Sequence, residues 1–308
     1  MVTLQRILCP IDFSESSRRA LIYAKALSSW YDAPLTVLHV CVDLPVFESV
    51  SPFGHTASTA VAVEEAQLAA RRAAVKTFVS RACGDYDLSI VVSEGSDASA
   101  EIVAKAGSDD GSLIVMGTHG RTGVNHLLLG SVTEAVLRRA SCPVLVIPPH
   151  APVDAVEPSR MFTRVLCAID FSTPSLAALR WALEIAQEAD AQLTLFHAIE
   201  RSPALREAVF ANEVDLDRLH AGADAQCLRW LRALVPDSAR EFCTVATEVS
   251  EGKASREISR AAAERQADLI VMGVHGRNAL GALVFGSNTN AVVRGAACPV
   301  LAVPAPRH

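Results

Sequence analysis

Short apolar runs alternate with longer segments of helical periodicity along the whole chain. A run such as Leu113-Ile114-Val115 contains no polar alternation and is typical of a parallel strand buried on both faces. The segment Ser16–Ser29 instead places its apolar residues at helical spacing. Strands and helices expected from these patterns follow one another in strict alternation. This order predicts an α/β fold with a parallel sheet and helices on both of its faces.

The first half of the chain contains one complete set of alternating elements. We expect strands at Gln5–Pro10, Leu35–Val40, Leu88–Ser93, Ser112–Met116 and Val144–Ile147. We expect helices at Ser16–Ser29, Ala60–Arg81, Ala98–Ala106 and Ser131–Ala140. The segment Asp43–Thr59 contains two prolines and a glycine, which predicts an irregular surface excursion. A lid over a binding site is the alternative interpretation of that segment.

The second half repeats the same order of elements. We expect strands at Arg164–Ala168, Leu193–Ile199, Phe242–Glu248, Asp268–Met272 and Val300–Val303, and helices at Pro174–Glu188, Leu205–Leu234 and Ser255–Arg265. From Met116 to Pro148, 18 of 33 positions are identical to the residue 156 positions later. The proline-rich segment Pro148–Pro158 is the expected linker. The sequence therefore predicts two tandem domains, 1–149 and 159–308, each built on a doubly wound, five-stranded parallel sheet.

A glycine motif follows the fourth expected strand of each half. It consists of Gly117, two residues, Gly120, nine residues and Gly130-Ser131, and it returns as Gly273, Gly276 and Gly286-Ser287. Glycines allow positive φ and a close approach to the backbone, and a helix N-terminus attracts anions, so we expect a phosphate site. The alternative is a local capping box at Ser131-Val132-Thr133-Glu134, which the second copy lacks because Asn290 replaces the Glu.

An aspartate follows the first expected strand of each half, at Asp12 and Asp170. If the first and fourth strands are neighbours, each carboxylate faces the crevice where α/β proteins hold ligands. Asp12 is then expected opposite Gly117, and Asp170 opposite Gly273. We interpret both carboxylates as nucleoside contacts, with an N-terminal helix cap as the alternative.

For other polar groups near the motif, the sequence indicates a ligand contact less clearly. Arg121 and Arg277 are placed to screen a polyphosphate, or they are solvated loop charges. His119 and His275 lie within the loops without any metal-ligand spacing around them, so loop hydrogen bonding is the better interpretation. The main chain at the ends of the second strands, at Val40 and Ala198, is placed to meet the edge of an adenine.

Composition narrows the class of protein. The chain has 308 residues and a formal net charge of −6, without the basic runs that bind nucleic acid. Its apolar stretches are shorter than the roughly 20 residues of a membrane span, and the first residues lack the order of a signal peptide. The eight Cys lie mostly in apolar segments and never as C-x-x-C, which favours buried thiols in a reducing cytoplasm.

Taken together, the glycine motif, the aspartate after the first strand and the terminal Cys-Pro-Val-Leu strand resemble the universal stress protein family. The resemblance covers essentially the whole chain, as a tandem two-domain member, and implies a sheet order of 3-2-1-4-5. The intact motif resembles that of the ATP-binding members, so it implies ATP, either alone or with Mg²⁺. It implies a first site lined by Asp12, Val40, Met116, Gly117, Gly120, Gly130, Ser131 and Val132. It implies a second site lined by Asp170, Ala198, Met272, Gly273, Gly276, Gly286, Ser287 and Asn288.

Three departures from the family pattern make the second site the weaker prediction, and they lie at Ala198, Asn288 and Ala279-Leu280-Gly281. Family members also pair through their last strands. Here Val144–Ile147 and Val300–Val303 could form that pair within one chain, as a pseudo-dimer of domains, and a homodimer is a further possibility.

The motifs of two large enzyme classes are missing. A dinucleotide oxidoreductase would have G-x-G-x-x-G after the first strand, and a P-loop phosphotransferase would have Lys after its glycines. The loops also lack an obvious general base. We therefore expect a nucleotide-dependent sensor or regulator of a stress response, with little or no hydrolysis. A slow ATP hydrolase and a nucleotide-free chaperone or scaffold are the alternatives.

Overall fold

The computed structural model describes residues 4–42, 57–107, 111–120, 129–153, 160–200, 216–274 and 286–306. The strands are β1 (Arg6–Ile11), β2 (Leu35–Cys41), β3 (Ser89–Glu94), β4 (Ser112–Gly117), β5 (Val144–Ile147), β6 (Arg164–Ala168), β7 (Gln192–Ile199), β8 (Thr244–Glu251), β9 (Leu269–Gly273) and β10 (Val300–Val303). The helices are α1 (Glu15–Tyr31), α2 (Ala57–Cys83), α3 (Ala98–Ala106), α4 (Ser131–Arg139), α5 (Thr173–Glu188), α7 (Leu216–Ala233), α8 (Asp237–Arg240), α9 (Ala254–Glu264) and α10 (Ser287–Gly295).

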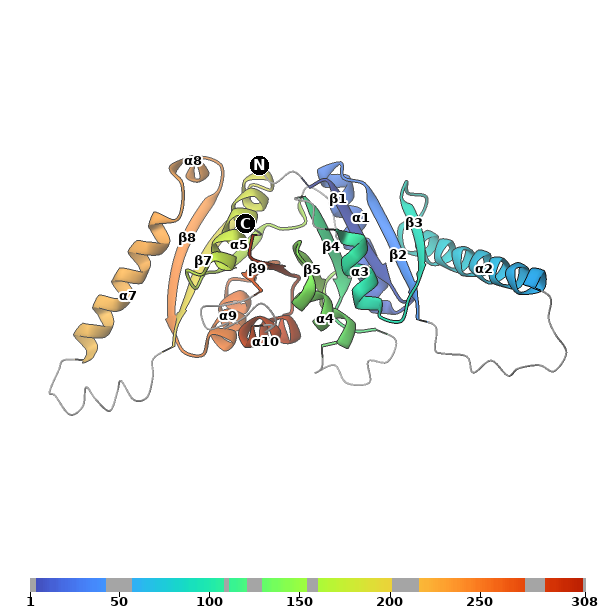
Figure 1. Cartoon of the computed structure of the whole chain (residues 1–308). Coiled ribbons are helices and arrows are strands. Elements are labelled where there is room, and N and C mark those ends of the chain that lie inside the picture. The colour runs from blue at the N-terminus through green and yellow to red at the C-terminus, as the bar shows by residue number, and fades with distance from the viewer. Residues whose placement is uncertain are drawn as a thin grey trace.

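All ten strands form one continuous sheet, in the order β3-β2-β1-β4-β5-β10-β9-β6-β7-β8 (Figure 1). Within each half the strands are parallel and follow the expected order 3-2-1-4-5. The halves meet where β5 and β10 run antiparallel, with Leu145 opposite Leu301. The expected pairing of last strands within one chain is confirmed. Each half thereby covers the edge that the other would leave open.

Helices cover both faces of this sheet, as the alternation of elements predicts. One apolar cluster packs α1, α2, α5 and α7 against one face, and a second packs α3, α4, α9 and α10 against the other. Buried strand residues such as Ile7 and Val37 belong to the first cluster, and their neighbours Leu8 and Leu38 belong to the second. Side chains alternate between the faces of a strand, so strands buried on both sides must be apolar throughout.

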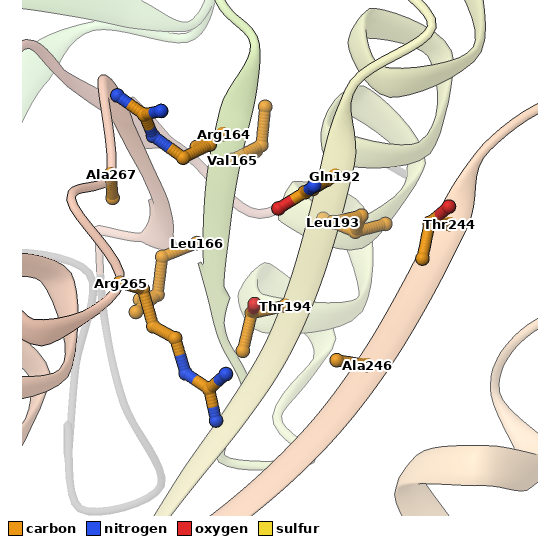
Figure 2. A pocket seen from close by; sticks show the side chains of 10 residues that line it. All are labelled: Arg164, Val165, Leu166, Gln192, Leu193, Thr194, Thr244, Ala246, Arg265 and Ala267. Atoms are coloured by element: carbon orange, nitrogen blue, oxygen red, sulfur yellow. The ribbon is translucent and has the colours of Figure 1, made fainter.

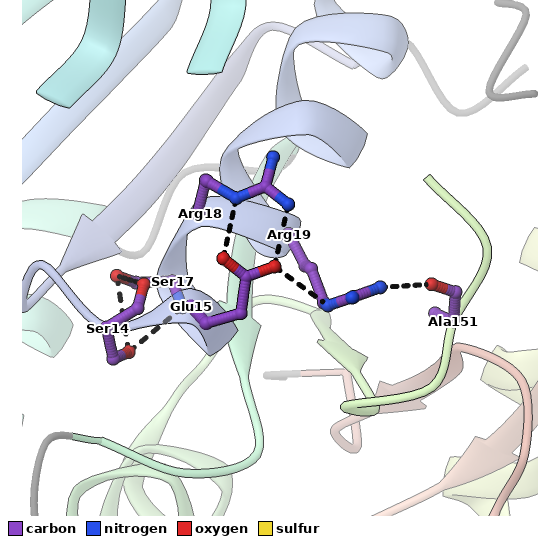
Figure 3. Close-up of polar contacts among 6 residues, drawn as sticks. All are labelled: Ser14, Glu15, Ser17, Arg18, Arg19 and Ala151. Atoms are coloured by element: carbon purple, nitrogen blue, oxygen red, sulfur yellow. Dashed lines mark hydrogen bonds and ion pairs between the residues drawn. The ribbon is translucent and has the colours of Figure 1, made fainter. Parts of the chain in front are cut away.

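The start of α1 is fixed by polar side chains (Figure 3). Ser14 is the N-cap and its Oγ accepts a hydrogen bond from the Ser17 amide at 3.1 Å. Glu15 forms ion pairs with Arg18 and Arg19, and Arg19 also donates to the Ala151 carbonyl at 2.8 Å. Ala151 follows β5, so these contacts fasten the first turn of α1 to the segment that leads into the second half.

The structure shifts several expected boundaries. Helix α2 is longer at both ends than expected, and the short helix α8 was not expected at all. The expected helix from Leu205 begins, within the described part, at Leu216. Residues 43–56, which carry most of the expected excursion, lie outside the described residues. Among the described helices, none is long and apolar enough to cross a membrane. The eight Cys are free thiols, and all but Cys227 are buried, as expected.

Candidate functional site at the carboxyl ends of the strands

In the first half, Asp12, Gly117 and Gly120 lie at the carboxyl ends of β1 and β4, which are neighbouring strands. The chain leaves β1 toward α1 on one face of the sheet and leaves β4 toward α4 on the other. Such a divergence of neighbouring parallel strands opens a crevice at their carboxyl ends. The same divergence occurs between β6 and β9 in the second half.

The Asp12 carboxylate lies against the glycine loop. Its Oδ1 accepts hydrogen bonds from the Ser14 amide at 3.1 Å and the Ser14 hydroxyl at 2.6 Å. Its Oδ2 would lie only 2.7 Å from a Cβ built on Gly120. The contact is therefore with Gly120 rather than with Gly117, and the cap of α1 is Ser14 rather than Asp12. A side chain at 120 would therefore force this carboxylate to shift.

Asp170 repeats this local arrangement in the second half. Its Oδ1 accepts hydrogen bonds from the amide of Ser172, at 3.0 Å, and from the Ser172 hydroxyl. Ser172 caps α5 just as Ser14 caps α1. The sequence Ile-Asp-Phe-Ser thus folds into the same turn twice.

Gly117, Gly120 and Gly273 do not use the freedom of glycine to adopt positive φ, because none of them has positive φ. Gly117 is instead required by packing: a Cβ there would lie 2.1 Å from Ser16 Oγ and 2.9 Å from the Ser16 carbonyl carbon. A Cβ at Gly273 would lie 2.8 Å from Pro174 Cβ. These two glycines let the first turn of α1 or α5 pack directly on the end of the neighbouring strand.

The start of α4 presents main-chain amides without a side-chain cap. Gly130 is the N-cap, so the alternative capping box at Ser131 is wrong, and Ser131 is the first residue of the helix. The Gly130 amide donates to the Thr118 carbonyl at 2.8 Å, so the start of α4 lies beside the end of β4. Helix α10 begins in the same way at Gly286, again without a side-chain cap. Bare amides at a helix N-terminus favour an anion.

Two hydroxyl groups that the sequence analysis missed join the starts of α4 and α10 to the ends of β4 and β9. Thr133 Oγ1 donates to the Gly117 carbonyl at 2.9 Å, and Thr289 Oγ1 donates to the Gly273 carbonyl at 2.9 Å. Both threonines are buried. Each ties the third residue of its helix to the end of the preceding strand, so the helix N-terminus is held at a fixed place above the sheet. The matched Thr in the two motif copies was the signal that could have identified them.

Phe13 and Phe171, also missed, have left-handed backbones with φ of 65° and 62°. Positive φ is rare for a bulky side chain. The Phe13 ring packs on His39 with centroids 4.6 Å apart, and the Phe171 ring packs on His197 at 5.0 Å. This backbone turn directs the preceding aspartate onto Ser14 or Ser172. The repeated Asp-Phe-Ser was the signal that could have shown it.

His119 lies in the first glycine loop. Its Nδ1 is 2.8 Å from Thr118 Oγ1, and its amide lies 3.5 Å from Ser16 Oγ as a long hydrogen bond. Its buried Nε2 has no hydrogen-bond partner among the residues that the structure describes. A buried ring nitrogen of this kind is suited to an additional polar partner at the loop. Among the described residues, no cluster of three metal-ligating side chains is present.

The remaining predicted residues divide into three groups. Met116 and Met272 have buried side chains, so they can offer a ligand only their main chain. Val40, Ala198, Ser131, Val132, Ser287 and Asn288 are half-buried or exposed around the crevices. Arg121, Gly276, Arg277 and His275 lie outside the described residues, as does the departure at Ala279–Gly281.

Two other features, a small pocket and a pair of buried thiols, are poorer candidates for a functional site. A small pocket of about 80 Å³ lies at the opposite, amino-terminal ends of β6, β7 and β8, between Arg164 and Arg265 (Figure 2). It is far smaller than the roughly 300 Å³ of an ordinary ligand pocket. Burial raises the pKa of the Cys9 and Cys167 thiols, so neither is a reactive nucleophile.

The fold and the paired loops define a tandem α/β protein with a switch-point crevice in each half. The sequence model of the universal stress protein family matches residues 3–148 and 161–304. The chain belongs to that family.

Some similar proteins match this chain along nearly its whole length, and others match about one half of it. Universal stress protein Rv2005c of Mycobacterium tuberculosis is 29% identical over 96% of this chain and 95% of its own length. A Thermus aquaticus universal stress protein is 34% identical over 46% of this chain and 99% of its own. The crystal structure of an Archaeoglobus fulgidus universal stress protein covers 99% of this chain and 98% of its own, with a TM-score of 0.65 and 23% identity.

Proposed function

We propose that this protein binds ATP at the switch-point crevice and acts as a nucleotide-dependent sensor or regulator in a stress response. The observation that carries this proposal is the meeting of Asp12 with Gly120, beside the uncapped start of α4. A carboxylate there is placed to accept hydrogen bonds from ribose hydroxyls. The α4 amides, with the Ser131 hydroxyl, are placed to donate to phosphate oxygens.

The residues fit the triphosphate better than they fit a dedicated metal. The described start of the loop after β4 offers main-chain amides and a surface free of side chains at Gly120. If Mg²⁺ accompanies ATP, it neutralises phosphate charge while bound mainly by phosphates and water, as is usual for this ion. Asp170 and the start of α10 support a second site of the same kind.

We infer little or no hydrolysis. Asp12 is the acidic group against the first loop, and its Oδ1 already holds two hydrogen bonds from Ser14, which suits a positioned acceptor rather than a proton carrier. Steady-state phosphate release separates the alternatives. A hydrolase would release phosphate continuously, whereas the proposed sensor retains ATP with little turnover.

The direct test is to denature the purified full-length protein by heat and assay the supernatant for adenine nucleotide, followed by calorimetric titration with ATP. We expect Gly120→Val to weaken ATP binding at the first site by about tenfold or more, because the side chain displaces the Asp12 carboxylate. Gly222→Ala in α7 is the matched control, since its Cβ meets open space. Unchanged affinity in Gly120→Val would contradict the proposed site, and a nucleotide-free protein that does not bind ATP would favour a scaffold.

A further inference from the structure

Three residues form a row across the carboxyl ends of β1, β2 and β3. Ile11 is in register with His39, and Val40 is in register with Ser93. Asp12 follows Ile11 and therefore lies level with Val40 and Ser93. Neighbouring strands are about 4.8 Å apart, so the row spans roughly 10 Å. A nucleoside whose ribose lies at Asp12 would carry its base toward Val40 and Ser93.

A glutamate lies at the far end of this row. Ser93 Oγ donates to Glu101 Oε2 at 2.7 Å, and Glu101 belongs to the first turns of α3. A Cβ built on Gly95 would lie 2.8 Å from Glu101 Cγ, so that glycine accommodates the bent side chain. Helix α3 packs on the same face of the sheet as Val40 and α4. The carboxylate is therefore on the side of the sheet where the α4 amides lie.

Glu257 is the equivalent glutamate in the second half, and its charged neighbours differ from those of Glu101. Ser250 Oγ donates to Glu257 Oε2 at 2.7 Å. Arg260, one turn along α9, also donates to Glu257 Oε2 from its Nε at 2.9 Å. The hydrogen bonds from Ser250 and Arg260 lower the pKa of Glu257. In this half the carboxylate is neutralised by a neighbouring guanidinium.

The first half lacks that arginine. Ala104 occupies the position of Arg260, and it is exposed. Among the described residues, no basic side chain forms an ion pair with Glu101, including Lys105 on the same helix. The negative charge of Glu257 is therefore neutralised by Arg260, whereas no described basic side chain neutralises that of Glu101.

We propose that Glu101 selects a purine with a 6-amino group at the first site. A carboxylate only accepts hydrogen bonds. It would accept from the 6-amino group of adenine and would repel the 6-oxo group of guanine. A site built to pair with a donor discriminates strongly against a ligand that lacks it. At the second site Arg260 weakens this discrimination. The proposal rests on the proposed function, since it identifies the base that the same crevice takes.

The test compares the equilibrium binding of ATP and GTP to the full-length protein. The protein carries Asp170→Ala to weaken the second site, so that the affinity measured is that of the first site. Ala104→Arg recreates the arginine of the second half on an exposed position, and Glu101→Gln keeps an acceptor for Ser93 while adding a donor. We expect both to lower the ratio of ATP to GTP affinity by about tenfold. Ala100→Arg is the matched control, because it adds the same charge next to Glu101 in sequence, where side chains do not face each other.

The reciprocal change is Arg260→Ala in protein carrying Asp12→Ala, which should raise the preference of the second site for ATP. Thermal unfolding of each variant verifies that it folds. If ATP binds but its preference over GTP is the same in Ala104→Arg, Glu101→Gln and the parent, the inference about Glu101 is wrong and the proposed function stands. If the protein without substitutions binds no ATP, the proposed function itself fails.

Discussion

The two halves of the molecule share the turn at the aspartate and differ in what surrounds it. Asp12 and Asp170 make the same hydrogen bonds to the following serine. At the helix start behind them, Ser16 in one half is replaced by Pro174 in the other. Later in each half, α3 is capped by the Asp97 side chain, whereas the first amide of α9 donates to Glu200. The fold therefore constrains the turn tightly and leaves the rest of the crevice free to diverge.

The largest effect should come from the strand pair that joins the halves. Leu145 and Leu301 face each other across this pair and are almost fully buried. Changing either to Ala should cost about 3 kcal/mol of unfolding free energy, through lost burial and a cavity. We expect both to lower one shared transition in urea unfolding, because the sheet is continuous. A variant that lowers only one of two separate transitions would contradict the joined sheet.

The packing glycines should give the next largest effect. Gly117→Ala and Gly273→Ala should each cost about 1–3 kcal/mol by overpacking. The nearest atom to the new methyl group is Ser16 Oγ in the first half but Pro174 Cβ in the second. Ser16→Ala should therefore recover part of the loss in Gly117→Ala, as measured by denaturant unfolding, although the Ser16 main chain still crowds the methyl group. Full stability of both single variants would contradict this packing.

At Phe13 and Phe171, which have left-handed backbones, a glycine variant should be more stable than an alanine variant. This is the reverse of the usual order of stability for these two substitutions. Phe13→Gly and Phe13→Ala both lose the ring contact with His39. Glycine tolerates positive φ, so Phe13→Gly should be more stable than Phe13→Ala by about 1 kcal/mol. The same order is expected at Phe171. Denaturant unfolding of the four variants measures this, and an alanine variant that equals or exceeds its glycine counterpart would show that the turn relaxes.

A smaller, pH-dependent difference is expected between Tyr23 and Trp181, which occupy matching positions in α1 and α5. Tyr23 Oη donates to the Pro152 carbonyl at 2.9 Å, and burial raises its pKa to about 12. The pKa of an unfolded tyrosine is about 10. Because the folded value is higher, this contribution is complete below about pH 10 and is lost as pH rises toward 12.

Tyr23→Phe should therefore cost about 1 kcal/mol at neutral pH and reduce the alkaline loss of stability. Trp181→Phe should leave the pH dependence unchanged, because indole does not titrate in this range. Unfolding free energies measured from pH 8 to 12 would decide the matter. An identical alkaline slope in Tyr23→Phe and the parent would contradict this role of Tyr23.

By itself, the sequence determined the order of strands and helices along the chain, the tandem repeat and the burial of the thiols. Those features follow from local spacing, since the lengths of apolar runs and the glycine motif are properties of neighbouring residues. The resemblance to the family also predicted the pairing of β5 with β10, which covers two otherwise open edges. The positions of Arg121, Gly276 and Arg277 relative to the crevices remain predictions.

Only the tertiary structure decided how the motif residues are used. It showed that Gly117 makes room for Ser16, that Asp12 meets Gly120 and that Phe13 is left-handed. It also showed that Arg260 neutralises Glu257, whereas no basic side chain in the described part of the chain pairs with Glu101. Each of these depends on segments that are distant in sequence, or on a backbone angle that neighbouring side chains enforce. Spacing along the chain carries no information about such contacts, because they form only when the strands and helices pack.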